Sequence, residues 1–169
     1  MGHIGQNEVA HFIRRKEHLR KKIQKDLLSL KIARESDIEC CCYYHLRKFL
    51  KRDPRWKVFA RRYAMRTGHY IDILIFHDAK PTIAMELKYD KNHIDIKDRK
   101  SLRSSVKSLG TGKAYFLATL VRTNPKYEPI KHKNRWESRR LIEIPVKLKM
   151  SKETLARWKR ERKKLRKLL

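Results

Sequence analysis

The chain has 169 residues, of which 45 are Lys or Arg and 18 are Asp or Glu, so its formal net charge is +27. Hydrophobic residues make up 40% of it, which excludes a disordered polyelectrolyte and predicts one domain over 1–169 with a buried core. The charge favours a polyanionic partner, most simply nucleic acid, although an anionic membrane surface or a ribosomal role would also satisfy it.

The sequence gives no sign of a membrane or secreted protein. No segment approaches the about 20 apolar residues of a membrane-spanning helix, and the first residues lack the apolar stretch of a secretory signal. The cysteines Cys40, Cys41 and Cys42 are consecutive, so they cannot form a tetrahedral metal site and are expected as small apolar residues of a helix. We therefore expect an intracellular protein with reduced thiols and no membrane span.

Two helices are expected first along the chain. Apolar residues recur at helical spacing over 7–30, with Lys and Arg on the other sides. A second helix is expected over 36–50, and it opens with Ser36 and Glu39 in the Ser-x-x-Glu spacing of a capping box.

The hydrophobic period then changes to that of strands. Strands are expected over 56–65, 70–76 and 82–88, because alternating apolar and aromatic residues are separated there by turn-forming residues. Four further elements are expected: a basic helix over 96–109, a strand over 114–121, a strand over 141–148 and a C-terminal helix capped by Ser151.

This order predicts an α/β fold with a central mixed sheet. A basic helical extension is expected over 1–34, a core over 35–121, and a late strand with a basic C-terminal helix over 122–169. The basic terminal helices would be additions to the central core.

The strands over 70–76 and 82–88 predict an antiparallel hairpin. With the turn centred on Ala79, Leu74 faces Ala84 and Phe76 faces Thr82. Directly opposed residues project to the same face of a sheet, so this register decides which side chains meet.

The same register brings three charged side chains together. Asp72 faces Glu86, and Lys88 lies two residues further along the same face. Two opposed carboxylates destabilise a sheet by up to about 1 kcal/mol unless a cation lies between them. Oxygen ligands of this kind favour Mg²⁺ or Mn²⁺.

A divalent cation beside a lysine, in a protein of charge +27, indicates phosphodiester hydrolysis. The metal would polarise the phosphoryl oxygen and lower the pKa of water. Lys88 would orient the attacking water or stabilise charge in the transition state.

The residues Asp72 and Glu86-Leu87-Lys88 resemble the motif of the PD-(D/E)xK nuclease superfamily. The α-β-β-β-α-β core of that family is similar to the element order expected from 36 to 121. Ile71 stands where the family name has proline. Small Holliday junction resolvases and several restriction and viral nucleases share such a compact basic core.

The resemblance implies a metal-dependent DNA endonuclease with Mg²⁺ or Mn²⁺ as cofactor. Asp72 and Glu86 would be metal ligands, with the backbone carbonyl of Leu87 as a further one, and Lys88 would be the catalytic lysine. Many members of the family carry another catalytic glutamate on the first core helix. Glu39 is the best match to that glutamate and Glu35 (Glu35 precedes the predicted cap) is the second.

Basic residues on both sides of the motif are candidates for phosphate contacts. They lie on the strand and turn before Asp72 and on the helix after Lys88: Arg61, Arg62, Arg66, Lys97, Arg99, Lys100, Arg103 and Lys107. A DNA nuclease that cuts two strands needs two sites, so a homodimer is one expected assembly, and recombination or repair is one expected context.

Simpler interpretations stand beside these. Asp72, Glu86 and Lys88 would also suit solvent-facing positions of an edge hairpin. The capping box by itself would explain Glu39. The rival functions are a non-catalytic DNA- or RNA-binding protein on the same fold, a ribosome-associated protein and, least favoured, a protein that lies on a membrane surface.

Overall fold

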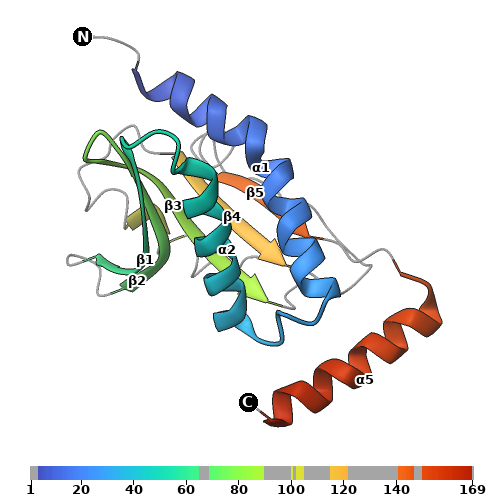
Figure 1. Cartoon of the computed structure of the whole chain (residues 1–169). Helices are drawn as coiled ribbons and strands as arrows, with labels where there is room; N and C mark the ends of the chain where they lie inside the picture. The colour runs from blue at the N-terminus through green and yellow to red at the C-terminus, as the bar shows by residue number, and fades with distance from the viewer. Residues whose placement is uncertain are drawn as a thin grey trace.

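The computed structural model describes residues 4–64, 69–89, 100, 102–104, 115–121, 141–146 and 150–168. In these residues a sheet is covered on one face by two helices, and a third labelled helix lies at one end (Figure 1). The elements are α1 (Ile4–Leu28), α2 (Glu35–Leu50), β1 (Trp56–Ala64), β2 (His69–His77), β3 (Lys80–Tyr89), β4 (Tyr115–Val121), β5 (Leu141–Val146) and α5 (Lys152–Leu168). Each corresponds to an element expected from the sequence.

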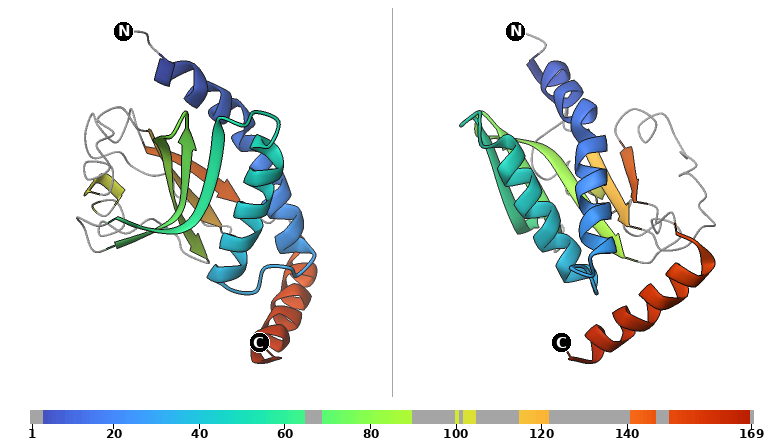
Figure 2. Two further views of the ribbon diagram at one scale, coloured as in Figure 1. Left: turned by 60° about the vertical axis from the view of Figure 1, so that its left-hand side comes forward. Right: turned by 45° about the vertical axis from the view of Figure 1, so that its right-hand side comes forward.

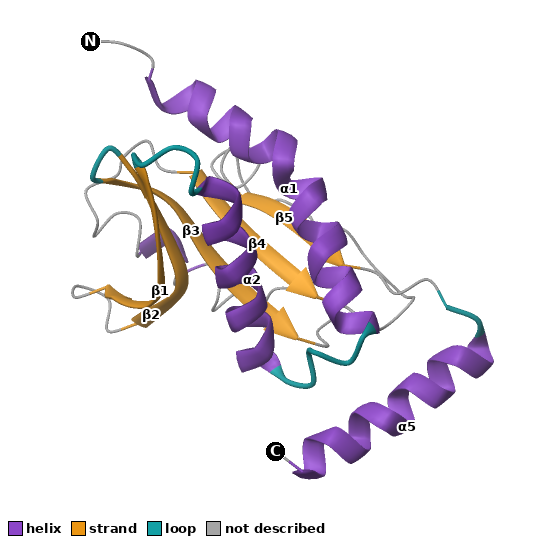
Figure 3. Cartoon of the chain, viewed as in Figure 1, coloured by secondary structure: helices purple, strands orange, loops and turns teal. Residues whose placement is uncertain are grey.

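The sheet has the order β1-β2-β3-β4-β5 and is mixed (Figure 3). Strands β1, β2 and β3 pair antiparallel, whereas β3, β4 and β5 pair parallel. The predicted α/β class with a mixed sheet is confirmed at this level. A parallel pair requires a crossover connection, and residues 102–104, in the connection from β3 to β4, are helical and lie across the sheet from α1 and α2 (Figure 2). The rest of the predicted helix over 96–109, apart from residue 100, lies outside the described residues.

The hairpin of β2 and β3 follows the predicted register in part. Leu74 faces Ala84 as predicted. The predicted pairing of Phe76 with Thr82 is wrong, because the register shifts by one residue near the turn and Phe76 faces Pro81. The predicted pairing of Asp72 with Glu86 is not part of the ladder, because the pairing of β2 with β3 ends at Ile73 and Met85.

The turn is shorter than the segment 77–81 that separates the two predicted strands. Only Asp78 and Ala79 lie between the paired ends of the two strands. Both have positive φ angles, 49° and 60°, as a two-residue hairpin turn of the type I′ class requires.

The hydrophobic core lies between the sheet and the two helices on its face. Helix α1 is part of this core. The sequence predicted it instead as a basic extension that is added to the core. The largest completely buried side chains are Ile23, Leu27, Ile32, Ile38, Leu46, Ile73, Ile75, Ile83, Met85 and Leu87. No helix in the described part of the chain is both long and apolar enough to cross a bilayer.

The start of α2 differs from the predicted capping box. The N-cap residue is Arg34, and the Asp37 carboxylate accepts hydrogen bonds from the backbone N–H groups of Ala33 (2.8 Å) and Arg34 (3.0 Å). The predicted box of Ser36 and Glu39 is therefore wrong, because Asp37 already caps this end. Glu39 is thus not needed for capping.

Helix α5 is fastened to the end of α1. The predicted cap is present, since the Ser151 hydroxyl accepts a backbone N–H from the first turn. Trp158 is 5% exposed, and its Nε1 donates to the Leu27 carbonyl at 3.0 Å. Arg166 Nε donates to the Ala33 carbonyl at 2.8 Å. The last carbonyls of a helix lack partners within it, so Trp158 supplies a donor that α1 itself cannot.

We predict that Trp158→Ala lowers the free energy of unfolding by about 3–5 kcal/mol, because it removes a buried aromatic side chain and one of the two hydrogen bonds that the Leu27 carbonyl accepts, the other coming from the Leu30 N–H. Urea denaturation followed by circular dichroism would measure this. The control Leu168→Ala, at a side chain that is 82% exposed on the same helix, should change stability little. Equal effects of the two substitutions would contradict the docking of α5 through Trp158.

Candidate active site

The candidate site lies where β2 and β3 separate. The two strands pair from the turn as far as Ile73 and Met85. Beyond that pair, residues 69–71 are paired with β1 and residues 86–89 are paired with β4. Figure 1 shows the β1–β2 hairpin bending away from β3 at this end. We call this place the fork.

Asp72 and Glu86 are the first residues beyond the last β2–β3 pair. Asp72 Oδ2 accepts a hydrogen bond from the backbone N–H of Leu87 at 2.7 Å. A side chain of one strand thus takes the place of a backbone partner on the other. The fork therefore exposes a strand end without leaving this amide unpaired.

A cavity of about 480 Å³ opens at the fork. It brings together residues of α2 and of the first three strands, which are far apart in the sequence. Its lining residues are Glu35, Ser36, Glu39, Arg61, Tyr70, Asp72 and Leu87. The predicted residues Asp72 and Glu39, together with the second glutamate match Glu35, therefore share one cavity.

The Asp72 carboxyl is strongly perturbed by its surroundings. Its pKa is raised to about 6, chiefly because burial penalises the ionised form. The Leu87 N–H and the charge of Lys88 oppose the rise, whereas the charges of Glu39 and Glu35 add to it. Asp72 is thus a desolvated carboxyl with acidic groups on one side and a lysine on another.

Glu39 is held by Arg61 rather than by a helix cap. Arg61 Nε lies 2.9 and 3.0 Å from the two carboxylate oxygens, and the Glu39 side chain is only 13% exposed. Arg61 has a φ of 46°, and the pairs on either side of it in β1 place it opposite Asp72. The Glu39 hydrogen bond is the main cause of a raised Arg61 pKa, and the Asp72 charge adds to it. Arg61, a predicted phosphate contact, therefore also forms an ion pair with Glu39, a candidate metal ligand.

Glu86 and Lys88 form an ion pair on β3. Lys88 Nζ donates to Glu86 Oε1 at 2.7 Å, and the two side chains are 14% and 13% exposed. The charge of Lys88 also reaches Asp72, whose pKa it lowers. The lysine therefore links Glu86 with Asp72 electrostatically.

Cys41 and Cys42 are poorly suited to act as nucleophiles. Cys42 is completely buried, and the pKa of Cys41 is raised to about 12 by burial and by the nearby charge of Asp26. Asp26 in turn lies 2.6 Å from His45 Nε2 across the contact between α1 and α2. A thiol with so high a pKa is protonated at neutral pH, so Cys41 and Cys42 serve packing, as the sequence predicted. The same prediction is wrong for Cys40, because its side chain is exposed on α2.

The other predicted phosphate contacts are only partly described. Lys100 and Arg103 are exposed, on or beside the short helical stretch after β3. The side chain of Arg62 and the residues Arg66, Lys97, Arg99 and Lys107 lie outside the described residues.

Sequence reasoning missed Tyr70, which lines the cavity and is 65% exposed. It lies two residues before Asp72 on the same strand, so period-two alternation could have pointed to it.

Within the described residues, no group of three or more His, Cys, Asp and Glu side chains is arranged as a ready metal site. Comparisons with protein-family models, curated proteins and solved structures found no match. The fork and its residues are therefore the basis for any assignment of function.

The raised pKa of Asp72 predicts a pH-dependent cost in stability. The folded protein, with a pKa of about 6, holds this proton more tightly than an unfolded chain with the ordinary value of 3.8. The free energy of unfolding therefore falls as the pH rises between these values, by about 3 kcal/mol in all. In EDTA, Asp72→Asn should be more stable than the wild type by up to about that amount at neutral pH and equally stable near pH 4.

Urea denaturation at both pH values would test this, with Asp78→Asn on the exposed hairpin turn as the matched control. A constant difference between wild type and Asp72→Asn at the two pH values would contradict a raised pKa.

Proposed function

We propose that the chain is a metal-dependent DNA endonuclease similar to the PD-(D/E)xK nucleases, with its site at the fork. The observation that carries this proposal is the desolvated Asp72 carboxyl, bonded to the Leu87 N–H beside Lys88. The order α2-β1-β2-β3-β4, with β4 parallel to β3, supports it, since the same order is expected of that family's core.

The donors at the fork are oxygen atoms, the type that a hard divalent cation prefers. Asp72, Glu39 and Glu35 line one cavity, and the two glutamates raise the pKa of Asp72, so a cation there would relieve a repulsion. Asp72, Glu39, Glu86 and the Leu87 carbonyl are the oxygen donors that would hold Mg²⁺ or Mn²⁺. When bound, the cation supplies Lewis-acid polarisation of the phosphoryl oxygens.

The residues of the chain divide the remaining tasks. Lys88 orients the attacking water and stabilises the negative charge that develops on the phosphoryl oxygens. Glu86 holds Lys88 in place through their 2.7 Å ion pair. Water adds to phosphorus and gives up one proton to solvent, one P–O ester bond breaks, and the departing oxygen takes up one proton from solvent. Arg61 pairs with Glu39 through its guanidinium, and a bound cation would take its place as the partner of that carboxylate.

DNA binding would rest on the surface charge. The net charge of +27 attracts a polyanion over long range, and exposed residues such as Lys100 and Arg103 offer phosphate contacts near the strand that carries Lys88. Such contacts bind without reading sequence. A homodimer would present two forks to the two strands of a duplex.

The second candidate is a nucleic-acid-binding protein without hydrolytic activity. It is favoured by the ion pairs of Glu39 with Arg61 and of Glu86 with Lys88, because both acids are then already neutralised without a metal. Activity of point variants separates the two candidates.

Cleavage of supercoiled plasmid and of a labelled four-way junction is expected with Mg²⁺ or Mn²⁺ and not with EDTA. Asp72→Ala should reduce the rate by at least about a hundredfold, because it removes a ligand that positions the reacting groups. Asp78→Asn should cut like the wild type. If neither substrate is cut while wild type and Asp72→Ala bind DNA equally well, the nuclease proposal fails and the binding protein is favoured.

Lys88→Met should abolish cutting but keep cation binding, because the lysine acts on water and phosphate rather than on the metal. Isothermal titration with Mn²⁺ would measure binding, and the plasmid assay would measure cutting. Lys80→Met, at the exposed start of the same strand, is the control and should leave both unchanged. Retained cutting by Lys88→Met would contradict the assigned role.

A further inference from the structure

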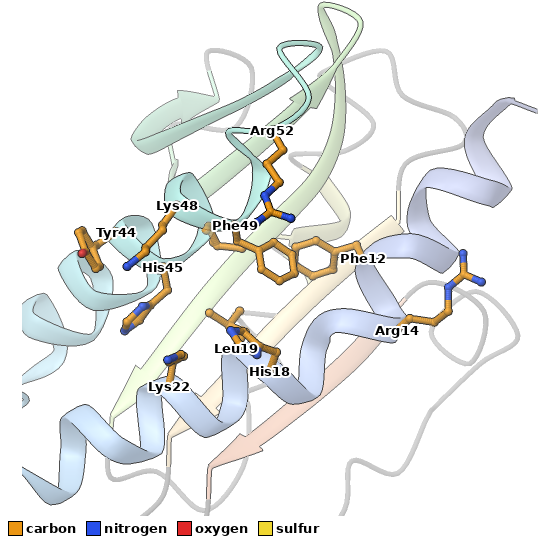
Figure 4. Close-up of a pocket in the computed structure, with 11 residues that line it drawn as sticks. Phe12, Arg14, His18, Leu19, Lys22, Tyr44, His45, Lys48, Phe49 and Arg52 are labelled. Atoms are coloured by element: carbon orange, nitrogen blue, oxygen red, sulfur yellow. The ribbon is translucent and has the colours of Figure 1, made fainter.

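A second cavity lies far along α2 from the fork. It measures about 510 Å³ and is bounded by α1 and by the C-terminal half of α2 (Figure 4). The fork uses Glu35, Ser36 and Glu39 at the start of α2, whereas this cavity begins at Tyr44. We call it the helix groove. Its volume is in the range of ligand-binding pockets.

The floor of the helix groove is aromatic. Phe12 is 2% exposed, and Phe49 stacks on His18 with ring centroids 5.9 Å apart and an interplanar angle of 26°. Phe12 and Phe49 both line the groove, one from each helix (Figure 4). Tyr44 lies at the rim and is 59% exposed. The groove thus combines a buried apolar floor with an accessible aromatic ring.

The rim of the helix groove is cationic. Arg14, Lys22, Lys48 and Arg52 all line it and are all exposed. Among the described residues that line it, none is acidic. Two acids of α1 close to it are already engaged, since Glu17 pairs with Arg20 and Asp26 with His45. The positive charge of the rim therefore favours an anionic ligand.

We propose that the helix groove binds a single-stranded segment of nucleic acid, with phosphates on its cationic rim and an unpaired base against its aromatic side chains. Aromatic rings beside a basic track are the usual means of holding a single strand. In a duplex the base faces are covered by their neighbours, so only an unpaired base can use Tyr44. An acidic peptide would satisfy the cations but has no planar base to stack on the exposed ring of Tyr44. The inference goes beyond the proposed hydrolysis and needs neither metal nor cleavage.

Binding of fluorescent oligothymidine, oligouridine and a duplex of equal length would be measured by anisotropy in EDTA, in the Asp72→Ala background. The test variants are Tyr44→Ala and the double reversal Lys48→Glu with Arg52→Glu. The matched control is Lys159→Glu with Lys163→Glu, two exposed positions of α5 that change the net charge equally. Circular dichroism would check that each variant is folded.

We expect the groove reversal to weaken single-strand binding at least about tenfold and to lower the salt slope by about 1.4, from two lost phosphate contacts. Tyr44→Ala should weaken single-strand binding at least about fivefold and leave duplex binding unchanged. The control should lose much less. The tighter of the two oligonucleotides then identifies the polymer that the groove prefers.

An equal loss in the control pair, or no effect of Tyr44→Ala, would overturn the proposal, because binding would then be diffuse electrostatics. Competition by polyglutamate as strong as by oligothymidine would also overturn it, in favour of an acidic peptide. These outcomes are independent of cleavage. A chain that binds single strands in the groove but never cuts DNA would refute only the nuclease proposal.

Discussion

The separation of β2 from β3 is the constraint on which the rest of the site depends. From the turn to Ile73 and Met85 the two strands pair with each other in antiparallel fashion. Beyond that pair, β2 is paired with β1 alone and β3 with β4 alone. The hydrogen bond from the Leu87 N–H to Asp72 joins the two branches across the opening. Because the chain cannot leave this buried amide unpaired without cost, the carboxyl that closes the fork is also held in one position.

The same arrangement explains why the site costs stability. Burial raises the pKa of Asp72, and two glutamates of α2 raise it further. Ionisation of this carboxyl is therefore unfavourable in the folded protein. The other two candidate acids are neutralised locally, Glu39 by Arg61 and Glu86 by Lys88. Such a set of closely placed charges is typical of a site that is completed by a ligand. The large apolar core between the sheet and the helices α1 and α2 can offset this cost.

Much of this fold could be predicted from hydrophobic periodicity, because every labelled helix and strand has an apolar pattern of its own. The grouping of Glu86 with Lys88 and the link of Asp72 to β3 could also be predicted, from alternation along the two strands. The fork could not, because it depends on where the pairing of β2 with β3 ends, which local patterns do not contain. The capping prediction failed because Asp37 lies one residue after Ser36 and reaches two backbone amides. The core role of α1 was missed because its many cations suggested a surface helix.

The central claim is that the fork binds a divalent cation, and Mn²⁺-induced broadening of backbone amide signals in NMR spectra tests it most directly. At substoichiometric Mn²⁺, the amides of Asp72, Leu87 and Glu39 should broaden first, and Asp72→Ala should abolish this effect. The amides of Asp78 and Ala79, at the far end of the same hairpin, should remain sharp. Broadening that spares the fork, or that affects both ends of the hairpin equally, would contradict the account.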